Sequence, residues 1–185
     1  ENNGDHEAAV EGRRKKGPAT AEKKASRSTS EGVIARHLSE DGKSGTIVEI
    51  NCETDFVAKN EKFLQFCDEI AAGYAADSGA DLEEQRTTAV AEIGENIQFT
   101  RNESLSIDGS GAVTAYIHHG AKVGVLLAVS TNKDETTGTD AFKQLLSDIT
   151  LQITAARPDA LDRTQLDPTK LEQERELARE QLQDQ

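Results

Sequence analysis

An internal repeat constrains this sequence more than any other feature. A shift of 79 residues lays 32–71 onto 111–150 without a gap. The aligned positions include Gly32 with Gly111, Lys43 with Lys122, Gly45 with Gly124, Phe63 with Phe142, Gln65 with Gln144 and Ile70 with Ile149. Identities are few, but the pattern of apolar residues is kept throughout. We therefore expect one structural unit to occur twice.

The repeated segment predicts a β-hairpin, a loop and a helix. In the first copy, 32–39 and 45–51 are the candidate strands, and "EDGKSG" supplies the turn residues. Beyond Asn60, a preferred N-cap residue, apolar side chains recur at helical spacing: Phe63, Phe66, Cys67, Ile70, Ala71 and Tyr74. Each copy would bury one face of a small antiparallel sheet under its helix. The expected fold class is α+β, with two related units and a helical C-terminal arm.

We divide the chain into four parts: 1–17, disordered or the remnant of an N-terminal helical domain; 18–108, core unit one; 109–161, core unit two; and 162–185, the arm. Pro18 suits the first position of a helix that runs to about Ser30. Unit one also has a candidate helix from Leu82 to about Ile93 and a candidate third strand near 95–107. Unit two has no such strand, so we expect it to be incomplete.

The two ends of the sequence carry further expectations. The first residue is Glu1, which indicates a processed chain or an excised fragment. The arm has a sparse apolar stripe among charged residues, typical of the start of a coiled-coil-like hairpin. Self-association through this arm stays open.

Composition indicates a protein with modest cores and no membrane span. Of 185 residues, 35% are hydrophobic and 4% aromatic, and no run of about 18 apolar residues or signal-peptide pattern occurs. Cys52 and Cys67 form neither a disulfide framework nor a metal-ligand spacing, and both fit packing positions. They suit a reducing compartment, so we expect a cytoplasmic location, with the mitochondrial matrix or plastid stroma as alternatives.

Charge is unevenly distributed. The net charge of −13 disfavours nucleic acid and anionic lipid as partners of the whole surface. Segment 13–27, however, carries seven Lys and Arg residues and one Glu. It is a solvated basic helix, a contact face for an acidic partner, or an RNA-binding arm. The RNA alternative is weakened because the segment has no aromatic residue for base stacking.

Phe56 interrupts a polar loop in "EINCETDFVAKNEKF" (49–63). In the second copy, the counterparts of Thr54, Asp55 and Phe56 are Lys133, Asp134 and Glu135. A ring needed for the fold should have an apolar counterpart, so the repeat favours an exposed Phe56 that serves as a binding anchor. Alternatively, Phe56 and Val57 tuck under the hairpin, or Phe56 acts as a staple on the next helix.

The sequence offers little for an enzyme. No sequence feature indicates that Cys52 and His118 lie close together as a nucleophile and a base, and no P-loop pattern occurs. His118 and His119 are adjacent, so on a strand they would point to opposite faces and share no metal. We expect no catalytic residue, no metal, no cofactor and no direct nucleotide binding.

Several stretches together resemble translation elongation factor Ts, a family of nucleotide-exchange factors for the GTPase elongation factor Tu: "NCETDFVAKNEKF", the preceding "IVEI", the upstream "RRKKG…A…KKASR…EG", "IGENI" (93–97) and "YIHHGAKVGVL" (116–126). The resemblance covers about residues 10–180 and implies a duplicated core of small antiparallel sheets with helices. Only the end of the family's N-terminal three-helix domain is represented. The chain also stops inside the helical hairpin after which many members complete the second core copy.

The resemblance also implies roles for individual residues. Phe56 would enter an apolar pocket of the partner's G domain, and Asp55 would approach the nucleotide's magnesium. The partner-binding residues so implied are Thr54, Asp55, Phe56 and Val57. Asp55 equally suits a helix or turn cap, and Thr54 also shapes the loop. Further contacts with elongation factor Tu would come from His118, His119, Lys23, Lys24 and Arg27.

The implied function is that of a guanine-nucleotide exchange factor, which is not itself an enzyme. Such a factor would bind elongation factor Tu–GDP and promote GDP release during translation elongation. The alternative is a ribosome- or RNA-associated accessory protein that uses segment 13–27.

Overall fold

The computed structural model describes residues 18–183. A helical segment, 18–24, precedes the first copy of the repeat. That copy comprises β1 (Glu31–Leu38), β2 (Ser44–Cys52), α2 (Asp55–Ala58), α3 (Glu61–Ala76), α4 (Glu83–Ile93) and β3 (Gln98–Ser106). The second comprises β4 (Gly111–Ile117), β5 (Gly124–Ser130), α5 (Asp134–Thr137) and α6 (Asp140–Ala156).

The predicted repeat is confirmed element by element. Under the 79-residue shift, α2 falls on α5 without an offset, and β1, β2 and α3 fall on β4, β5 and α6 to within one or two residues. The strand register is also shared, because Gly32 lies opposite Asn51 and the equivalent Gly111 lies opposite Ser130. The two hairpins are therefore built on one plan.

Gly32 and Gly111 show why this plan needs glycine. Their φ angles are +145° and +148°, a conformation that side chains with a Cβ rarely adopt. A Cβ on Gly32 would overlap the carbonyl oxygen of Ile50, and one on Gly111 would overlap that of Val129. The backbones of the paired strands thus approach each other closely at the same place in both hairpins.

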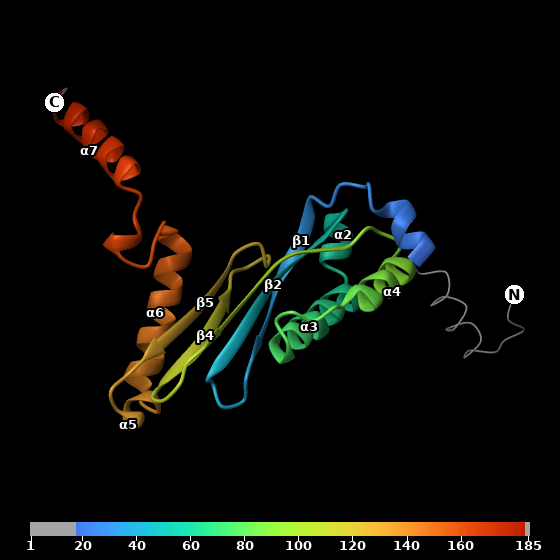
Figure 1. Cartoon of the computed structure of the whole chain (residues 1–185), viewed down its shortest axis with the longest axis horizontal. Helices are drawn as coiled ribbons and strands as arrows, with labels where there is room; N and C mark the ends of the chain where they lie inside the picture. The colour runs from blue at the N-terminus through green and yellow to red at the C-terminus, as the bar shows by residue number, and fades with distance from the viewer. Residues whose placement is uncertain (1–17, 184–185) are drawn as a thin grey trace, which may run out of the picture. The chain divides into compact units, whose positions relative to one another are not determined.

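Alternation along the strands sorts side chains between two faces of the three-stranded sheet, whose order is β1–β2–β3. Val48, Ile50 and Cys52 are fully buried on one face, where they join a core with Phe63 and Ile70 of α3. Figure 1 shows α3 and α4 on this face, the β4–β5 hairpin on the other, and α6 beyond that hairpin. The α+β class is confirmed.

The two hairpins pack through reciprocal contacts. The N–H of Ile34 donates to the carbonyl of Ala121 at 2.7 Å, and the N–H of Val113 donates to the carbonyl of Gly42 at 2.8 Å. Ile34 and Val113 are equivalent positions of the repeat, as are Gly42 and Ala121. Such exchanged contacts are typical of an isologous, two-fold interface. The chain therefore contains an approximate dimer of hairpins within itself.

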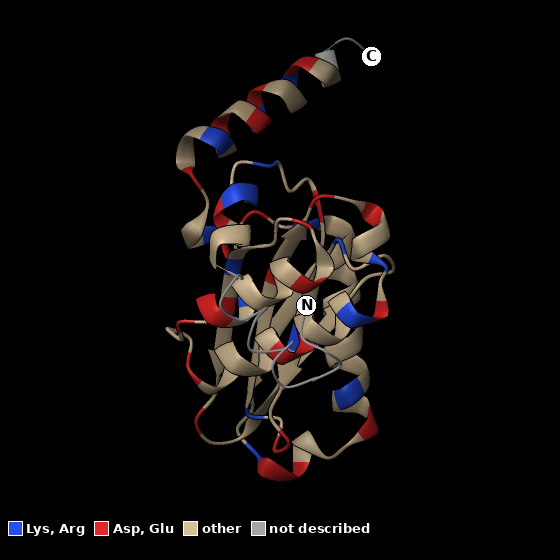
Figure 2. Ribbon diagram, turned by 90° about the vertical axis from the view of Figure 1, so that its right-hand side faces the viewer, with Lys and Arg blue, Asp and Glu red and all other residues tan. Residues whose placement is uncertain are grey.

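Contacts divide the chain between Thr154 and Ala155. The C-terminal unit contains a 3-10 turn (Arg163–Gln165) and α7 (Pro168–Gln183). Acidic and basic residues are interspersed along α7 (Figure 2), and Glu172 pairs with Arg175 at 3.3 Å and with Arg179 at 3.5 Å. Leu177 and Leu182 are exposed on it. The predicted helical arm is confirmed as a helix; its self-association stays a prediction.

The first helix is shorter than predicted, because it ends at residue 24 and not near Ser30. The amide of Asn96 donates to the carbonyl of Arg27 at 2.9 Å, which ties the segment after this helix to the turn before β3. The helix predicted near 82–93 and the third strand near 95–107 are confirmed as α4 and β3.

Among the described residues, β4 and β5 form a two-stranded sheet. The boundaries proposed for the core units, 18–108 and 109–161, stay an interpretation of the repeat. The expectation for 1–17 lies outside the described residues. None of the helices within 18–183 is long and apolar enough to cross a membrane.

Candidate functional site

Thr54 caps the short helix that carries Phe56. Its backbone is extended, and its hydroxyl accepts a hydrogen bond from the N–H of Val57 at 3.3 Å. The N–H of Ala58 donates to the carbonyl of Thr54 at 3.2 Å and closes the turn. Thr54, not Asp55, is therefore the N-cap, and Asp55 is the first helical residue. The helix-cap alternative for Asp55 is wrong, because Thr54 occupies the cap position.

Phe56 is exposed over 83% of its surface. Its neighbours in α2 hold the helix in place, since Val57 packs against the core and Ala58 is buried. The predicted exposure of Phe56 is confirmed, and the alternative that tucks the ring under the hairpin is wrong for Phe56. The same alternative holds in part for Val57. The role of these residues in binding stays a prediction.

Asp55 forms an ion pair with Lys59, with 2.8 Å between Oδ2 and Nζ. The hydrogen bond from Lys59, together with its charge, lowers the pKa of Asp55 below its ordinary value. The same pair raises the pKa of Lys59. Asp55 is therefore ionised at neutral pH and stands beside the exposed ring as a negative charge.

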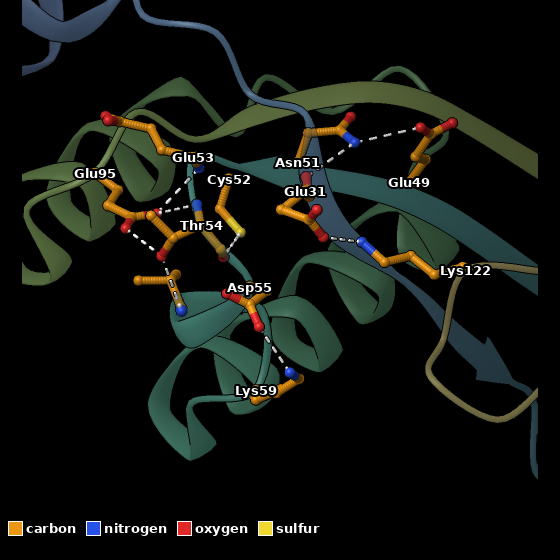
Figure 3. Close-up of polar contacts among 11 residues, drawn as sticks. Glu31, Glu49, Asn51, Cys52, Glu53, Thr54, Asp55, Lys59, Glu95 and Lys122 are labelled. Atoms are coloured by element: carbon orange, nitrogen blue, oxygen red, sulfur yellow. Dashed lines mark hydrogen bonds and ion pairs between the residues drawn. The ribbon is translucent and has the colours of Figure 1, made fainter.

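The carboxylate of Glu95, in the turn between α4 and β3, binds the loop that precedes α2. Glu95 Oε2 accepts the N–H groups of Glu53 and Thr54, each at 3.0 Å, and Oε1 accepts the Thr54 hydroxyl at 2.6 Å (Figure 3). In return, the N–H of Asn96 donates to Glu53 Oε1 at 2.6 Å. Hydrogen bonds in both directions therefore join residues 53–54 to residues 95–96.

The tip of the β4–β5 hairpin lies at the same end of the sheets as α2. Lys122 at this tip pairs with Glu31 at 2.5 Å, and Glu31 lies opposite Cys52 where β2 ends (Figure 3). His118 and His119 are exposed there, and the ring of His118 contacts the Tyr116 hydroxyl at 3.1 Å. The structure thus brings together two segments that the sequence analysis singled out separately.

The predicted basic contacts differ in their surroundings. Lys23 is exposed, whereas Lys24 donates to the carbonyl of Gly94 at 2.5 Å. Arg27 pairs with Glu53 at 3.5 Å. Lys24 therefore supports the turn that joins α4 to β3, and Arg27 supports the loop that carries Phe56; contact of all three residues with a partner stays a prediction. Residues 13–17 of the basic segment lie outside the described chain.

The cysteines serve packing. Cys52 and Cys67 are free and buried, as expected. Burial raises the pKa of Cys52 to about 11, and it also raises the pKa of Cys67. Both thiols are therefore protonated at neutral pH and poor nucleophiles. Within 18–183, no group of three or more His, Cys, Asp and Glu residues could hold a metal ion.

The family model described as "Elongation factor TS" matches residues 53–185, a range that begins at the loop of Phe56. The chain belongs to the elongation factor Ts family. It is 39% identical to elongation factor Ts of Clostridium novyi, with 98% of this chain and 63% of the relative aligned.

Two more relatives give similar figures. Elongation factor Ts of Nitratiruptor sp. is 40% identical over 98% of this chain and 63% of its own length. Elongation factor Ts of Trichlorobacter lovleyi is 40% identical over 95% of this chain and 61% of its own length. This elongation factor Ts family member thus spans somewhat less than two thirds of the curated relatives that it matches.

Glu95 is the residue of this family member that sequence reasoning missed. Its stretch, "IGENI", contributed to the resemblance, but no role was assigned to its carboxylate. The sequence carried no direct signal for this role, because the third helical position, where a capping box places its acid, is occupied by Val57. Here the acid arrives from 41 residues further along the chain.

Proposed function

We propose that this chain is a guanine-nucleotide exchange factor for elongation factor Tu. It binds the GDP-bound GTPase and promotes GDP release during translation elongation, and the hydrolytic chemistry belongs to the partner. The observation that carries this proposal is Phe56, a large apolar ring 83% exposed on a capped and fastened helix. Membership of the elongation factor Ts family supports it.

The mechanism follows from linkage between two ligands of one GTPase. A partner that binds the nucleotide-free form more tightly weakens nucleotide binding by the same coupling free energy. Burial of one Phe side chain contributes roughly 1.5–3 kcal/mol. The ring of Phe56 alone would therefore accelerate GDP release by about one to two orders of magnitude.

Asp55 supplies the electrostatic part of the proposal. Its carboxylate is ionised, exposed and adjacent to Phe56 in sequence. As Phe56 enters its pocket, this charge comes near the nucleotide's magnesium, where it disturbs the hydration of the ion or moves a switch segment. Asp55 must leave Lys59 to do so, and an exposed ion pair of this kind costs little to break.

The hairpin tip provides a second contact with the same partner. His118 and His119 lie at the end of the sheets where α2 presents Phe56, because Lys122 and Glu31 join the two regions. One partner can therefore cover both regions with a single continuous surface. We place His118 and His119 against a domain of elongation factor Tu other than its G domain.

The test is release of fluorescent GDP from elongation factor Tu, with and without the chain. Phe56→Ala should lower the acceleration by about tenfold to a hundredfold, in line with the loss of one buried ring. Its thermal melt should match that of the wild type, because the ring is exposed. Leu105→Ala is the matched control, since Leu105 is an apolar side chain 39% exposed on β3.

Two outcomes would count against the proposal. The first is a wild-type chain that leaves GDP release unchanged. The second is an equal loss of acceleration in Phe56→Ala and Leu105→Ala, because removal of any exposed apolar group would then have the same effect.

A further inference from the structure

The direction of Phe56 must be set through its backbone. An 83% exposed ring has few contacts within its own chain, and α2 has only four residues. A helix this short is not stable by itself, because nucleation is unfavourable and few hydrogen bonds repay it. Some other part of the molecule must therefore hold the start of α2 in place.

The Glu95 carboxylate meets this requirement with three hydrogen bonds. Two come from the consecutive N–H groups of Glu53 and Thr54, and the third comes from the Thr54 hydroxyl. The same hydroxyl oxygen accepts from the N–H of Val57. Thr54 and Glu95 thus reproduce both halves of a capping box, with the acid contributed by the turn that joins α4 to β3.

This turn is itself well anchored. Gly94 ends α4 in the left-handed conformation, and its carbonyl accepts from Lys24. Asn96 is fully buried, with its N–H on Glu53 and its amide on the carbonyl of Arg27. Glu95 therefore projects from a segment that the first helix and the core hold in one position.

We propose that Glu95 is a positioning residue for nucleotide exchange, which fixes the direction of Phe56 by clamping Thr54. This inference rests on the exchange function proposed above. A ring held in its binding direction loses less conformational entropy on docking than a ring on a loose turn. Removal of the Glu95 carboxylate should therefore weaken nucleotide exchange, although neither the Phe56 ring nor the partner is altered.

The primary experiment measures the dependence of fluorescent GDP release on chain concentration, with elongation factor Tu as the partner. Glu95→Ala should lower the acceleration by about tenfold, which corresponds to about 1.4 kcal/mol, the size of a lost helix cap. Glu95→Gln should stay within about threefold of the wild type, since its amide oxygen still accepts both N–H groups. Glu92→Ala, which removes an exposed carboxylate of α4, is the matched control and should have no effect.

A double variant separates positioning from general stability. If Glu95 acts mainly through Phe56, then Glu95→Ala should cost much less acceleration in the Phe56→Ala background than in the wild type, because only Asp55 is then left on α2 to position. A residue that only stabilises the fold would add its own loss in both backgrounds. Full additivity of the two losses would overturn the inference.

A readout without the partner tests the clamp directly. In the chain alone, Glu95→Ala should speed amide hydrogen exchange at Thr54 and Val57 by about tenfold, while amides in β1 and α3 keep their protection. Unchanged exchange at Thr54 would overturn the clamp.

The two proposals fail in different ways. A wild-type chain that does not accelerate GDP release refutes the exchange function. A wild-type chain that does, together with an equally active Glu95→Ala variant, refutes only the positioning role.

Discussion

The α2 and α5 segments occupy equivalent places on two equivalent hairpins, yet only α2 presents an apolar ring. Each follows its hairpin through the same type of bond: Cys52 Sγ donates to the carbonyl of Thr54 at 3.3 Å, and the equivalent Thr131 hydroxyl donates to the carbonyl of Lys133 at 2.8 Å. The backbone path into both helices is therefore shared.

The side chains at the start of the two helices differ. Thr54 caps α2, whereas Lys133, an ammonium that cannot accept a hydrogen bond, stands at the cap position of α5 and makes no side-chain cap bond to the described residues. Asp134 bonds instead to the Ser110 hydroxyl at 2.6 Å. The two copies therefore share the packed hairpin scaffold. Only the first copy combines a side-chain helix cap (Thr54), a carboxylate that binds it (Glu95) and an exposed ring (Phe56).

The largest effects should come from the shared scaffold. Gly32→Ala and Gly111→Ala each place a Cβ on a carbonyl oxygen of the facing strand, at positive φ. Both should lower the free energy of unfolding by about 3 kcal/mol or more. Urea denaturation measures this, with Gly120→Ala as the control because its Cβ would meet nothing within 4 Å. A cost at Gly111 no larger than that at Gly120 would break the equivalence of the two hairpins.

An intermediate effect should appear at alkaline pH. Burial raises the pKa of Cys52 from 9.0 to about 11, so the folded state holds the thiol proton more tightly than the unfolded state. Its contribution to stability is complete below the unfolded pKa and is lost as pH rises through about 11. With 1.36 kcal/mol per pKa unit, the loss is about 2–3 kcal/mol.

Cys52→Thr tests this prediction by installing the residue of the second copy. Thr does not titrate in this range and can donate the same hydrogen bond, so the variant should lose less stability than the wild type between about pH 8 and pH 11. Urea titrations at both pH values measure the difference. Parallel pH profiles for the two proteins would show that Cys52 does not contribute to the alkaline loss.

The smallest effects should come from exchanging the caps. Thr54→Val removes the acceptor for the N–H of Val57 and should destabilise α2 by about 1–2 kcal/mol. Lys133→Thr adds a side-chain acceptor at the cap position of α5, where the N–H of Thr136 already donates to the carbonyl of residue 133 at 3.2 Å, so it should stabilise α5 by only about 0.5 kcal/mol. Amide hydrogen exchange at Val57 and at its counterpart Thr136 reports both changes. Faster exchange at Val57 in Thr54→Val together with slower exchange at Thr136 in Lys133→Thr would support the comparison. Changes in the same direction at both amides would contradict it.

Much of each copy could be predicted from local patterns. The hairpin strands, the Asn60 cap and the helix after it followed from periodicity and turn residues, and Asn60 Oδ1 does accept the N–H of Lys62. The exposure of Phe56 followed from a comparison between copies, because Glu135 could not fill a core position. The choice of Thr54 over Asp55 as the cap did not follow, since both residue types cap helices well.

The sequence by itself determined the hairpins, the longer helices and where a ring faces solvent, because periodicity, glycine and turn chemistry act over short stretches of chain. The four-residue helices α2 and α5 were expected as loops, since they are too short to show a periodic pattern. Only the tertiary structure decided that Glu95 clamps Thr54 and that the tip with His118 and His119 lies at the end of the sheets where α2 presents Phe56. Those contacts join segments 41 or more residues apart in sequence, through the hydrogen bonds of one carboxylate and through one ion pair. Such pairings depend on how α4, β3 and the two hairpins pack, and they leave no periodic pattern in the sequence of either segment.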